Sequence, residues 1–175
     1  MGKVVIIAIL VAALLGGIGI WYTNNRAFYA AIDGPVTLTL TQGDDLSTLP
    51  ARDVDAIAST SSPLGFRACF QHDLTTPEDL ADAYASPEPT VAPGWFDCFD
   101  ASALAALLTS GEARAFTAYK NVQFGVDRVV ALTPDGRGWA WHQLNECGKK
   151  SYDGTPVGEA CPDRATYTPL TEGSL

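Results

Sequence analysis

The sequence predicts an α+β protein in which one membrane-spanning helix is followed by one exported domain. That domain is expected to hold an antiparallel sheet of four or five strands, two short helices and two disulfides. The stretch from Val4 to Tyr22 carries no charge and is apolar enough to cross a bilayer. About 150 residues follow it, enough for one domain with a buried core. Apolar and polar residues alternate in several of its segments, as in half-buried strands.

The chain divides into an anchor at residues 1–23, a connector at residues 24–35 and an exported domain at residues 36–175. The apolar stretch ends in Trp21 and Tyr22, which favour the membrane–water interface. A cleaved signal peptide is the alternative, but its apolar core is usually about 7 to 15 residues long and ends in a small-residue cleavage site. We therefore expect an uncleaved anchor with its N-terminus inside, because the N-terminus is short and a long following domain is readily translocated.

The charge distribution limits the classes of partner. Lys3 is the one Lys or Arg before the span, whereas all 20 Asp and Glu residues follow it. The exported part is therefore acidic, which argues against nucleic acid or anionic lipid headgroups as partners. A basic protein partner remains compatible with this charge.

Strand patterns recur along the exported part. They occur at residues 36–40, 64–70, 113–121, 125–132 and 138–144, with a further short one at 52–57. The last two long segments flank an Asp-Gly turn, which predicts a β-hairpin. The tail from Cys147 onward is rich in Gly and Pro and is expected to be irregular.

Two segments carry helix signals. Thr76 followed by a proline and two acidic residues predicts the start of a short helix that ends near Tyr84. Asp100 or Ser102 is expected to cap a second helix at residues 101–109, where leucines share one face.

The four cysteines all lie beyond the anchor. An even number in an exported domain predicts two disulfides in an oxidising compartment. Of the three possible pairings, the local one, Cys69–Cys98 with Cys147–Cys161, suits the predicted segments best. A zinc site is the competing interpretation, but the sequence has no C-x-x-C pair.

Several polar and aromatic residues form a possible functional cluster. These residues are Trp95, Asp97, Asp100, Asp127, Arg128 and His142. The structural interpretation is that Trp95 fills the core, Asp100 caps the second helix and Asp97 orders its loop through backbone hydrogen bonds. Asp127 is then expected to pair with Arg128 or Arg137. The alternative is that carboxylates among apolar residues have raised pKa values and carry out chemistry.

No catalytic residue, cofactor or metal site is predicted. His72, Asp73, His142 and Glu146 are the available metal ligands, but two histidines about 70 residues apart are a weak signal. The serine-rich segment at residues 59–62 lacks a nucleophile elbow and a recognisable base.

Five blocks of sequence resemble a family of single-pass alphaproteobacterial membrane proteins that carry a domain of unknown function. They lie at residues 65–70, 92–101, 125–131, 135–138 and 141–148, and Pro-Gly-Trp-Phe-Asp-Cys-Phe-Asp within the second block is the most specific. Members sometimes carry the label "histidine kinase", but this sequence has no Gly-rich ATP loop. The resemblance implies an inner-membrane protein whose C-terminal domain faces the periplasm.

These observations favour a non-enzymatic accessory or interaction subunit of an inner-membrane complex, either an envelope or a respiratory one. A membrane protein is the expected partner, beside which the anchor would place the domain. The alternative is a periplasmic ligand-binding or enzymatic module that uses the region of Trp95, Asp97 and Asp127.

Overall fold

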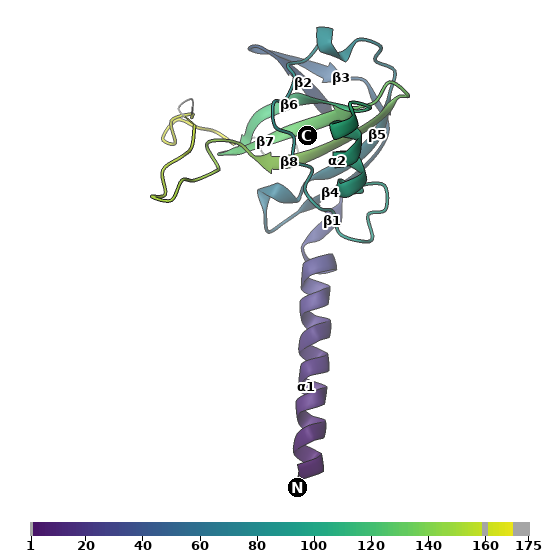
Figure 1. Ribbon diagram of the computed structural model, residues 1–175, viewed down its shortest axis with the longest axis vertical. Helices are drawn as coiled ribbons and strands as arrows, with labels where there is room; N and C mark the ends of the chain where they lie inside the picture. The colour runs from purple at the N-terminus through teal and green to yellow at the C-terminus, as the bar shows by residue number, and fades with distance from the viewer. Residues whose placement is uncertain (1, 159–160, 170–175) are drawn as a thin grey trace.

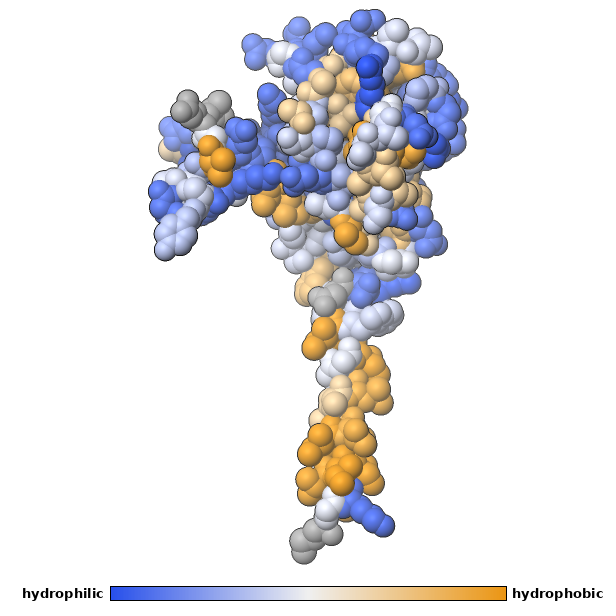
Figure 2. Space-filling view, in the orientation of Figure 1, coloured by the Kyte–Doolittle hydropathy of each residue, from blue (hydrophilic) through white to orange (hydrophobic). Residues whose placement is uncertain are grey.

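The computed structural model describes residues 2–158 and 161–169. Helix α1, Gly2–Tyr22, extends away from the rest of the chain, and a turn of π-helix, Thr23–Ala27, continues it (Figure 1). The side chains of α1 are exposed and form a hydrophobic column below a largely hydrophilic domain (Figure 2). This helix is long and apolar enough to cross a membrane, a property that signal sequences share.

The domain is built on an antiparallel sheet of six strands. In spatial order they are β1 (Tyr29–Ala31), β4 (Ala51–Ser59), β5 (Arg67–His72), β8 (Arg137–Leu144), β7 (Val126–Leu132) and β6 (Arg114–Gln123). Strands β2 (Leu38–Gln42) and β3 (Asp45–Leu49) form a separate antiparallel pair. The prediction of four or five strands in the sheet was too low, because β1 has only three residues and lies in the predicted connector, where no alternating pattern marks it.

Two hydrophobic cores lie on the two faces of the sheet. Strand β7 is buried along its whole length, so alternate side chains enter alternate cores. Val130 faces the core that β2 and β3 cover, and Val129 faces the core beneath α2, Ala101–Ser110. Trp141 is the largest fully buried side chain and belongs to the α2 core. Figure 1 shows α2 lying across the front of the sheet.

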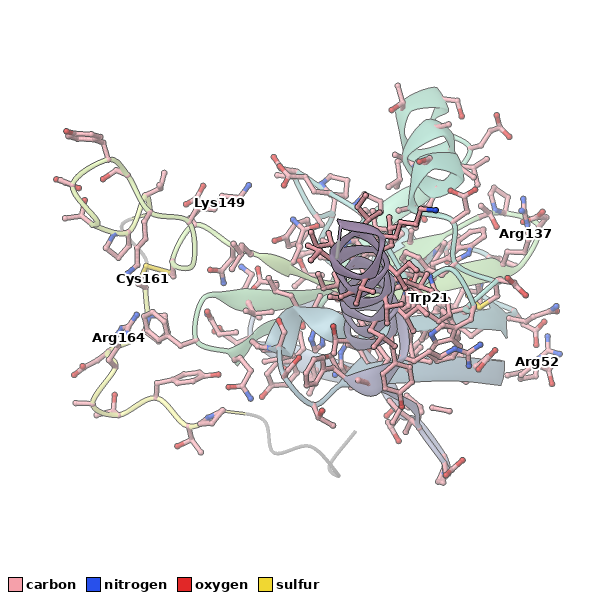
Figure 3. The ribbon with its side chains drawn as sticks, turned by 90° about the horizontal axis from the view of Figure 1, so that it is seen from below. Trp21, Arg52, Arg137, Lys149, Cys161 and Arg164 are labelled. Atoms are coloured by element: carbon pink, nitrogen blue, oxygen red, sulfur yellow. A yellow bond between two sulfur atoms is a disulfide. The ribbon has the colours of Figure 1, made fainter. Side chains whose placement is uncertain are left out.

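Both disulfides join the cysteines that the segment layout favours. Cys69–Cys98 connects β5 to the segment before α2, and Cys147–Cys161 closes a loop after β8. Beyond β8 the chain forms an irregular arm that projects to one side of the domain (Figure 1). Viewed along α1, this arm lies on the opposite side of the domain from Arg52 and Arg137 (Figure 3).

The predicted helix that ends near Tyr84 is not formed. The chain makes a single 3₁₀ turn, Pro77–Asp79, and the side chain of Thr76 does not cap it. The following residues run along the edge of β6 instead, where Tyr84 N–H donates to the Ala115 carbonyl at 2.9 Å. Backbone hydrogen bonds to a sheet edge therefore replace the bonds of a short helix. Within the domain, α2 is the one α-helix among the described residues.

The predicted connector at residues 24–35 is partly integrated into the domain. Its residues 29–31 form β1, in which Tyr29 pairs with Ser59 of β4. Just before β1, the Phe28 carbonyl accepts a hydrogen bond from Thr60 N–H at 2.9 Å. The indole N–H of the half-buried Trp95 donates to the Asn25 carbonyl. The end of the helix is thus attached to the sheet at several points.

Asp100 and Asp97 offer a matched test of the capping interaction. Asp100 Oδ1 accepts hydrogen bonds from Ser102 N–H and Ala103 N–H at 2.9 and 3.1 Å, as expected of an N-cap. Asp97 is exposed and makes no hydrogen bond to the described residues, contrary to its predicted role. Asp100→Ala should lower the free energy of unfolding by about 1 kcal/mol, and Asp97→Ala by less than about 0.5 kcal/mol. Urea unfolding of the full chain in a neutral detergent measures both, and equal losses would contradict this assignment.

Candidate functional site

A cavity of about 300 Å³ opens at one end of the sheet face that β2 and β3 cover. It is lined by residues 58–63, Phe66, Val122, Gln123, Arg128 and His142. The lining combines a serine-rich turn, apolar side chains and one cationic group, and it contains no carboxylate. This volume is at the lower end of the range for ligand pockets, so the cavity suits a small ligand.

Strand pairing brings two of the polar side chains of the cavity together. Arg128 on β7 and His142 on β8 are direct cross-strand partners. Residues 127 and 128 are adjacent in a strand and therefore point to opposite faces of the sheet. For this reason Asp127 does not pair with Arg128.

The guanidinium of Arg128 is buried without a carboxylate partner. The residue is 2% exposed, and its Nε–H donates to His142 Nε2 at 3.0 Å. Its Cζ lies 4.3 Å from the centre of the Phe66 ring, which supplies a cation–π contact. Its two Nη groups make no hydrogen bond or ion pair to any residue within 2–158 and 161–169. Burial lowers the pKa of Arg128 to about 10, so the group stays charged at neutral pH.

His142 is held in one neutral tautomer. Its Nδ1–H donates to the Pro63 carbonyl at 2.6 Å, which leaves Nε2 to accept from Arg128. Burial, and secondarily the charge of Arg128, lowers the pKa of His142 to about 3. The ring also stacks on Phe66 at a centroid distance of 4.8 Å. Because both nitrogens are occupied and the ring is neutral near pH 7, His142 orients Arg128 and does not exchange protons.

The serine-rich turn forms the outer wall of the cavity. Ser59 Oγ accepts a hydrogen bond from Ser61 N–H at 3.2 Å, and Ser62 Oγ accepts one from Leu64 N–H at 3.3 Å. The 3₁₀ turn Pro63–Gly65 follows. A Cβ at Gly65 would lie 2.1 Å from Ser59 Cβ, so the close approach of these two segments requires glycine.

A second buried arginine fixes this wall from the other face of the sheet. Arg67 is 3% exposed, and its Nη1 donates to the Leu64 carbonyl at 2.6 Å. Its Nε and Nη2 donate to the carbonyls of Thr90 and Val91 at 2.7 and 3.0 Å. Burial also lowers its pKa to about 10. Unlike Arg128, Arg67 has most of its donors satisfied by backbone carbonyls.

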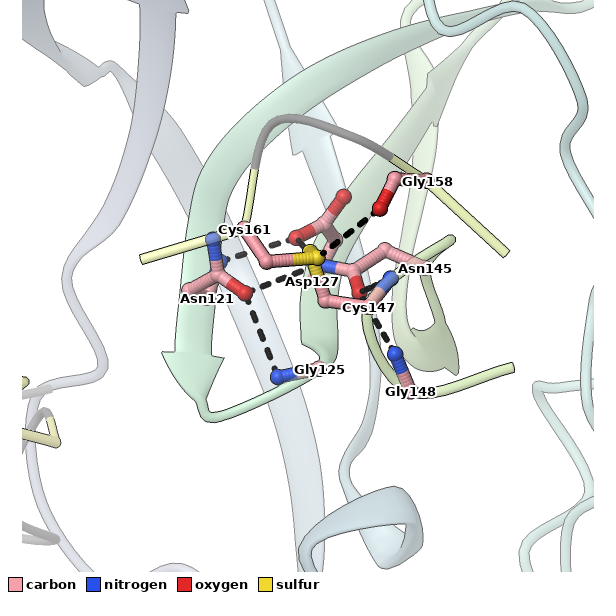
Figure 4. Close-up of a disulfide and its surroundings, with 8 residues drawn as sticks. All are labelled: Asn121, Gly125, Asp127, Asn145, Cys147, Gly148, Gly158 and Cys161. Carbon is pink, nitrogen blue, oxygen red and sulfur yellow. Dashed lines mark hydrogen bonds between the residues drawn. A yellow bond between two sulfur atoms is a disulfide. The ribbon is translucent and has the colours of Figure 1, made fainter. Parts of the chain in front are cut away.

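The structure separates the predicted cluster into different roles. Arg128 and His142 meet in the cavity, whereas Asp127 lies on the opposite face of the sheet. Asp127 Oδ1 accepts from Asn121 N–H at 2.8 Å and from the Asn145 amide at 2.7 Å, which ties the β6–β7 turn to the chain after β8 (Figure 4). Its predicted pairing with Arg128 or Arg137 is therefore wrong, and Arg137 pairs with Asp135 instead.

The remaining predicted residues lie outside the cavity. Trp95 packs against the edge of the α2 core and lies beneath the Arg26 guanidinium, whose Cζ is 4.9 Å from the ring centre. His72 is buried elsewhere, and no group of three or more His, Cys, Asp or Glu residues within the described chain is arranged to bind a metal. Sequence reasoning did not identify the cavity, although an arginine inside the apolar run of residues 126–132 was a signal for it.

Comparison with known proteins gives one match. The profile of a family of unknown function, DUF6446, matches residues 36–162, a range that contains every residue lining the cavity. No curated protein and no solved structure matches the chain.

The neutral state of His142 makes stability depend on pH. Its pKa is about 3 in the folded protein and about 6.5 in the unfolded chain. The unfolded state therefore takes up the proton first as the pH falls, so stability present above pH 6.5 is progressively lost toward pH 3. Between pH 7 and pH 5 we expect His142 to account for a loss of about 2 kcal/mol.

Urea unfolding of the wild-type chain and of His142→Asn, each at pH 7 and at pH 5, isolates the contribution of His142 to the pH dependence of stability. The asparagine offers a donor to the Pro63 carbonyl but does not titrate. Between pH 7 and pH 5 the unfolding free energy of the variant should therefore fall by about 2 kcal/mol less than that of the wild type. The same pH dependence in both proteins would show that His142 is not buried in its neutral form.

Proposed function

We propose that this chain, which belongs to the family of unknown function DUF6446, is a membrane-anchored exported protein that binds a small anion in the Arg128 cavity. The observation that carries the proposal is the buried Arg128 guanidinium, whose two Nη groups have no partner among the described residues and whose side chain lines a cavity. An anion in this cavity would supply the missing acceptors.

The energetics of a buried charge favour a binding role for Arg128. Transferring an ion from water into a protein costs several kcal/mol unless hydrogen bonds and an opposite charge compensate for it. Among the described residues Arg128 has one hydrogen-bond partner and one aromatic contact, so its Nη groups are left to the solvent of the cavity or to a ligand. A planar guanidinium with two free Nη groups matches carboxylate or phosphate oxygens in a bidentate geometry.

The chemistry of the lining favours binding over catalysis. None of the lining residues is a carboxylate, and His142 is neutral with both ring nitrogens in hydrogen bonds. The hydroxyls of the serine-rich turn therefore lack a general base, although they and the adjacent backbone N–H groups are suitable anion donors. The volume of about 300 Å³ suits an anion such as phosphate, sulfate or a small carboxylate.

We further propose that α1 is an uncleaved anchor and that the domain faces the periplasm from the inner membrane. Cleavage near Ala30 or Ala31 would remove most of β1, the Phe28–Thr60 hydrogen bond and the contact between Trp95 and Asn25. A signal peptide whose flanking residues belong to the fold is an unfavourable arrangement. The two disulfides and the sequence resemblance support an oxidising, extracytoplasmic location.

The predicted role as an accessory subunit of a membrane complex stays a prediction. One feature of the structure supports it as a second candidate. The arm after β8 carries Tyr152 and Val157, which are fully and largely exposed, and the Cys147–Cys161 disulfide constrains it. Tyrosine is enriched among the residues that contribute most to binding at protein interfaces, so Tyr152 is a candidate contact for a protein partner.

Titration of the full chain in a neutral detergent with inorganic phosphate, sulfate and acetate tests anion binding. At one hundred times Kd a bound anion raises the free energy of unfolding by about 2.7 kcal/mol. We expect at least one of the three anions to raise the melting temperature of the wild type and to leave that of Arg128→Met unchanged.

Arg137→Met is the matched control, because Arg137 is exposed and already pairs with Asp135. This variant should respond like the wild type. No response of the wild type to any of the three anions, or an equal response of Arg128→Met, would overturn the proposal.

A further inference from the structure

The lining of the Arg128 cavity carries one formal charge among the described residues. Arg128 is the cation, and none of the other described residues of the lining is a carboxylate, a lysine or a second arginine. His142 adds no positive charge at neutral pH, because burial lowers its pKa to about 3 and both ring nitrogens are in hydrogen bonds. The cavity therefore compensates one negative charge on a ligand.

This charge balance separates the classes of anion. Phosphate monoesters carry about 1.5 to 2 negative charges at pH 7, and sulfate is a dianion. The charge beyond the first would leave water without a second cation to pair with, which is unfavourable. The chain has a formal net charge of −9, so its long-range field also repels multiply charged anions more strongly than singly charged ones. A carboxylate has one charge and two oxygens that match the planar guanidinium, and is the better fit.

The lining offers no counter-charge to an ammonium group on the same ligand. No described residue of the lining is a carboxylate, and the ammonium group of an α-amino acid would lie close to the guanidinium that binds its carboxylate. Like charges at short range disfavour this arrangement. The polar groups that remain are uncharged, namely the hydroxyls of the serine-rich turn and the amide of Gln123. A ligand of this cavity is therefore expected to carry no cationic group.

Apolar side chains form another part of the lining. Phe66 and Val122 are 3% and 2% exposed and line the cavity together with Ala58 and Pro63. Because the Phe66 ring lies against the Arg128 guanidinium, apolar surface is present next to the point at which a carboxylate would bind. The volume of about 300 Å³ is room for on the order of ten water molecules, of which acetate fills a small part. A ligand that fills the cavity has a carbon body attached to its carboxylate.

We propose that the ligand of the Arg128 cavity is an organic monocarboxylate with an uncharged, largely apolar body of about the size of hexanoate. This inference rests on the proposed anion-binding function and names its ligand class. Inorganic phosphate and sulfate are then weaker ligands of the same guanidinium.

Isothermal titration of the full chain in a neutral detergent with four six-carbon compounds tests each requirement separately. Hexanoate has the proposed charge and body, adipate adds a second carboxylate, 6-aminohexanoate adds an ammonium group, and 1-hexanol removes the charge. Hexanoate should bind at least about tenfold more tightly than acetate, because each methylene removed from water lowers Kd about fourfold. The other three compounds should each bind at least about tenfold more weakly than hexanoate.

Two variants establish that the signal comes from the cavity. Arg128→Met should lose the binding of hexanoate, and Arg137→Met, in which an exposed arginine paired with Asp135 is replaced, should bind it like the wild type. Heat from entry of hexanoate into detergent micelles is measured without protein and subtracted. The comparison of the four compounds on the wild type does not depend on the folding of Arg128→Met. Equal binding of hexanoate by the wild type and a folded Arg128→Met would overturn the proposal.

The outcomes also separate this inference from the proposed function. Binding of adipate, 6-aminohexanoate or 1-hexanol as tight as that of hexanoate would overturn the assignment to a monocarboxylate. If phosphate or sulfate stabilises the wild type through Arg128 while hexanoate binds no more tightly than acetate, the anion site stands and the ligand class is wrong. If neither the inorganic anions nor acetate nor hexanoate binds, the proposed function fails together with this inference.

Discussion

Moving a guanidinium group out of water requires that its five N–H donors find acceptors, and the domain that follows α1 buries two such groups, those of Arg67 and Arg128. Arg67 meets this requirement with backbone carbonyls of two loops, so its burial fixes the position of both loops against the sheet. Arg128 meets it only in part, through His142 and the Phe66 ring. Arg67 therefore shapes the cavity, and Arg128 places in it a charge that has no carboxylate partner among the described residues.

One wall of the cavity is also connected to helix α1. Strand β4 carries the serine-rich turn at its end and pairs with β1, which follows α1 after a single turn of π-helix. Contacts from Trp95 and Thr60 to the main chain of residues 25 and 28 hold this junction in place. The wall of the cavity that carries Ser59 and Thr60 is thus joined to the end of α1 by sheet hydrogen bonds.

Local signals in the sequence were sufficient for several features of the fold. The Asp-Gly turn correctly placed the β7–β8 hairpin, Asp100 correctly marked the start of α2, and loop lengths favoured the observed disulfides. The predicted helix near residues 76–84 was wrong because edge hydrogen bonds to β6 replaced it, which no local pattern shows. The cavity depends on strand register, which brings together side chains from β4, β6, β7 and β8 and the Phe66 ring that precedes β5. Sequence adjacency suggested instead that Asp127 and Arg128 would pair, although strand geometry sends them to opposite faces.

The central claim is that the charge of Arg128 serves to bind a ligand and does not stabilise the fold. Unfolding free energies of Arg128→Met and Arg67→Met, measured by urea denaturation without added anions in a phosphate-free detergent, test it most directly. Arg67→Met should lose about 3 kcal/mol or more, because several buried carbonyls lose their donors. Arg128→Met should change stability by no more than about 1 kcal/mol in either direction, since one hydrogen bond is lost while an uncompensated charge is removed. A loss for Arg128→Met as large as that for Arg67→Met would show that Arg128 is a structural residue and would contradict the account.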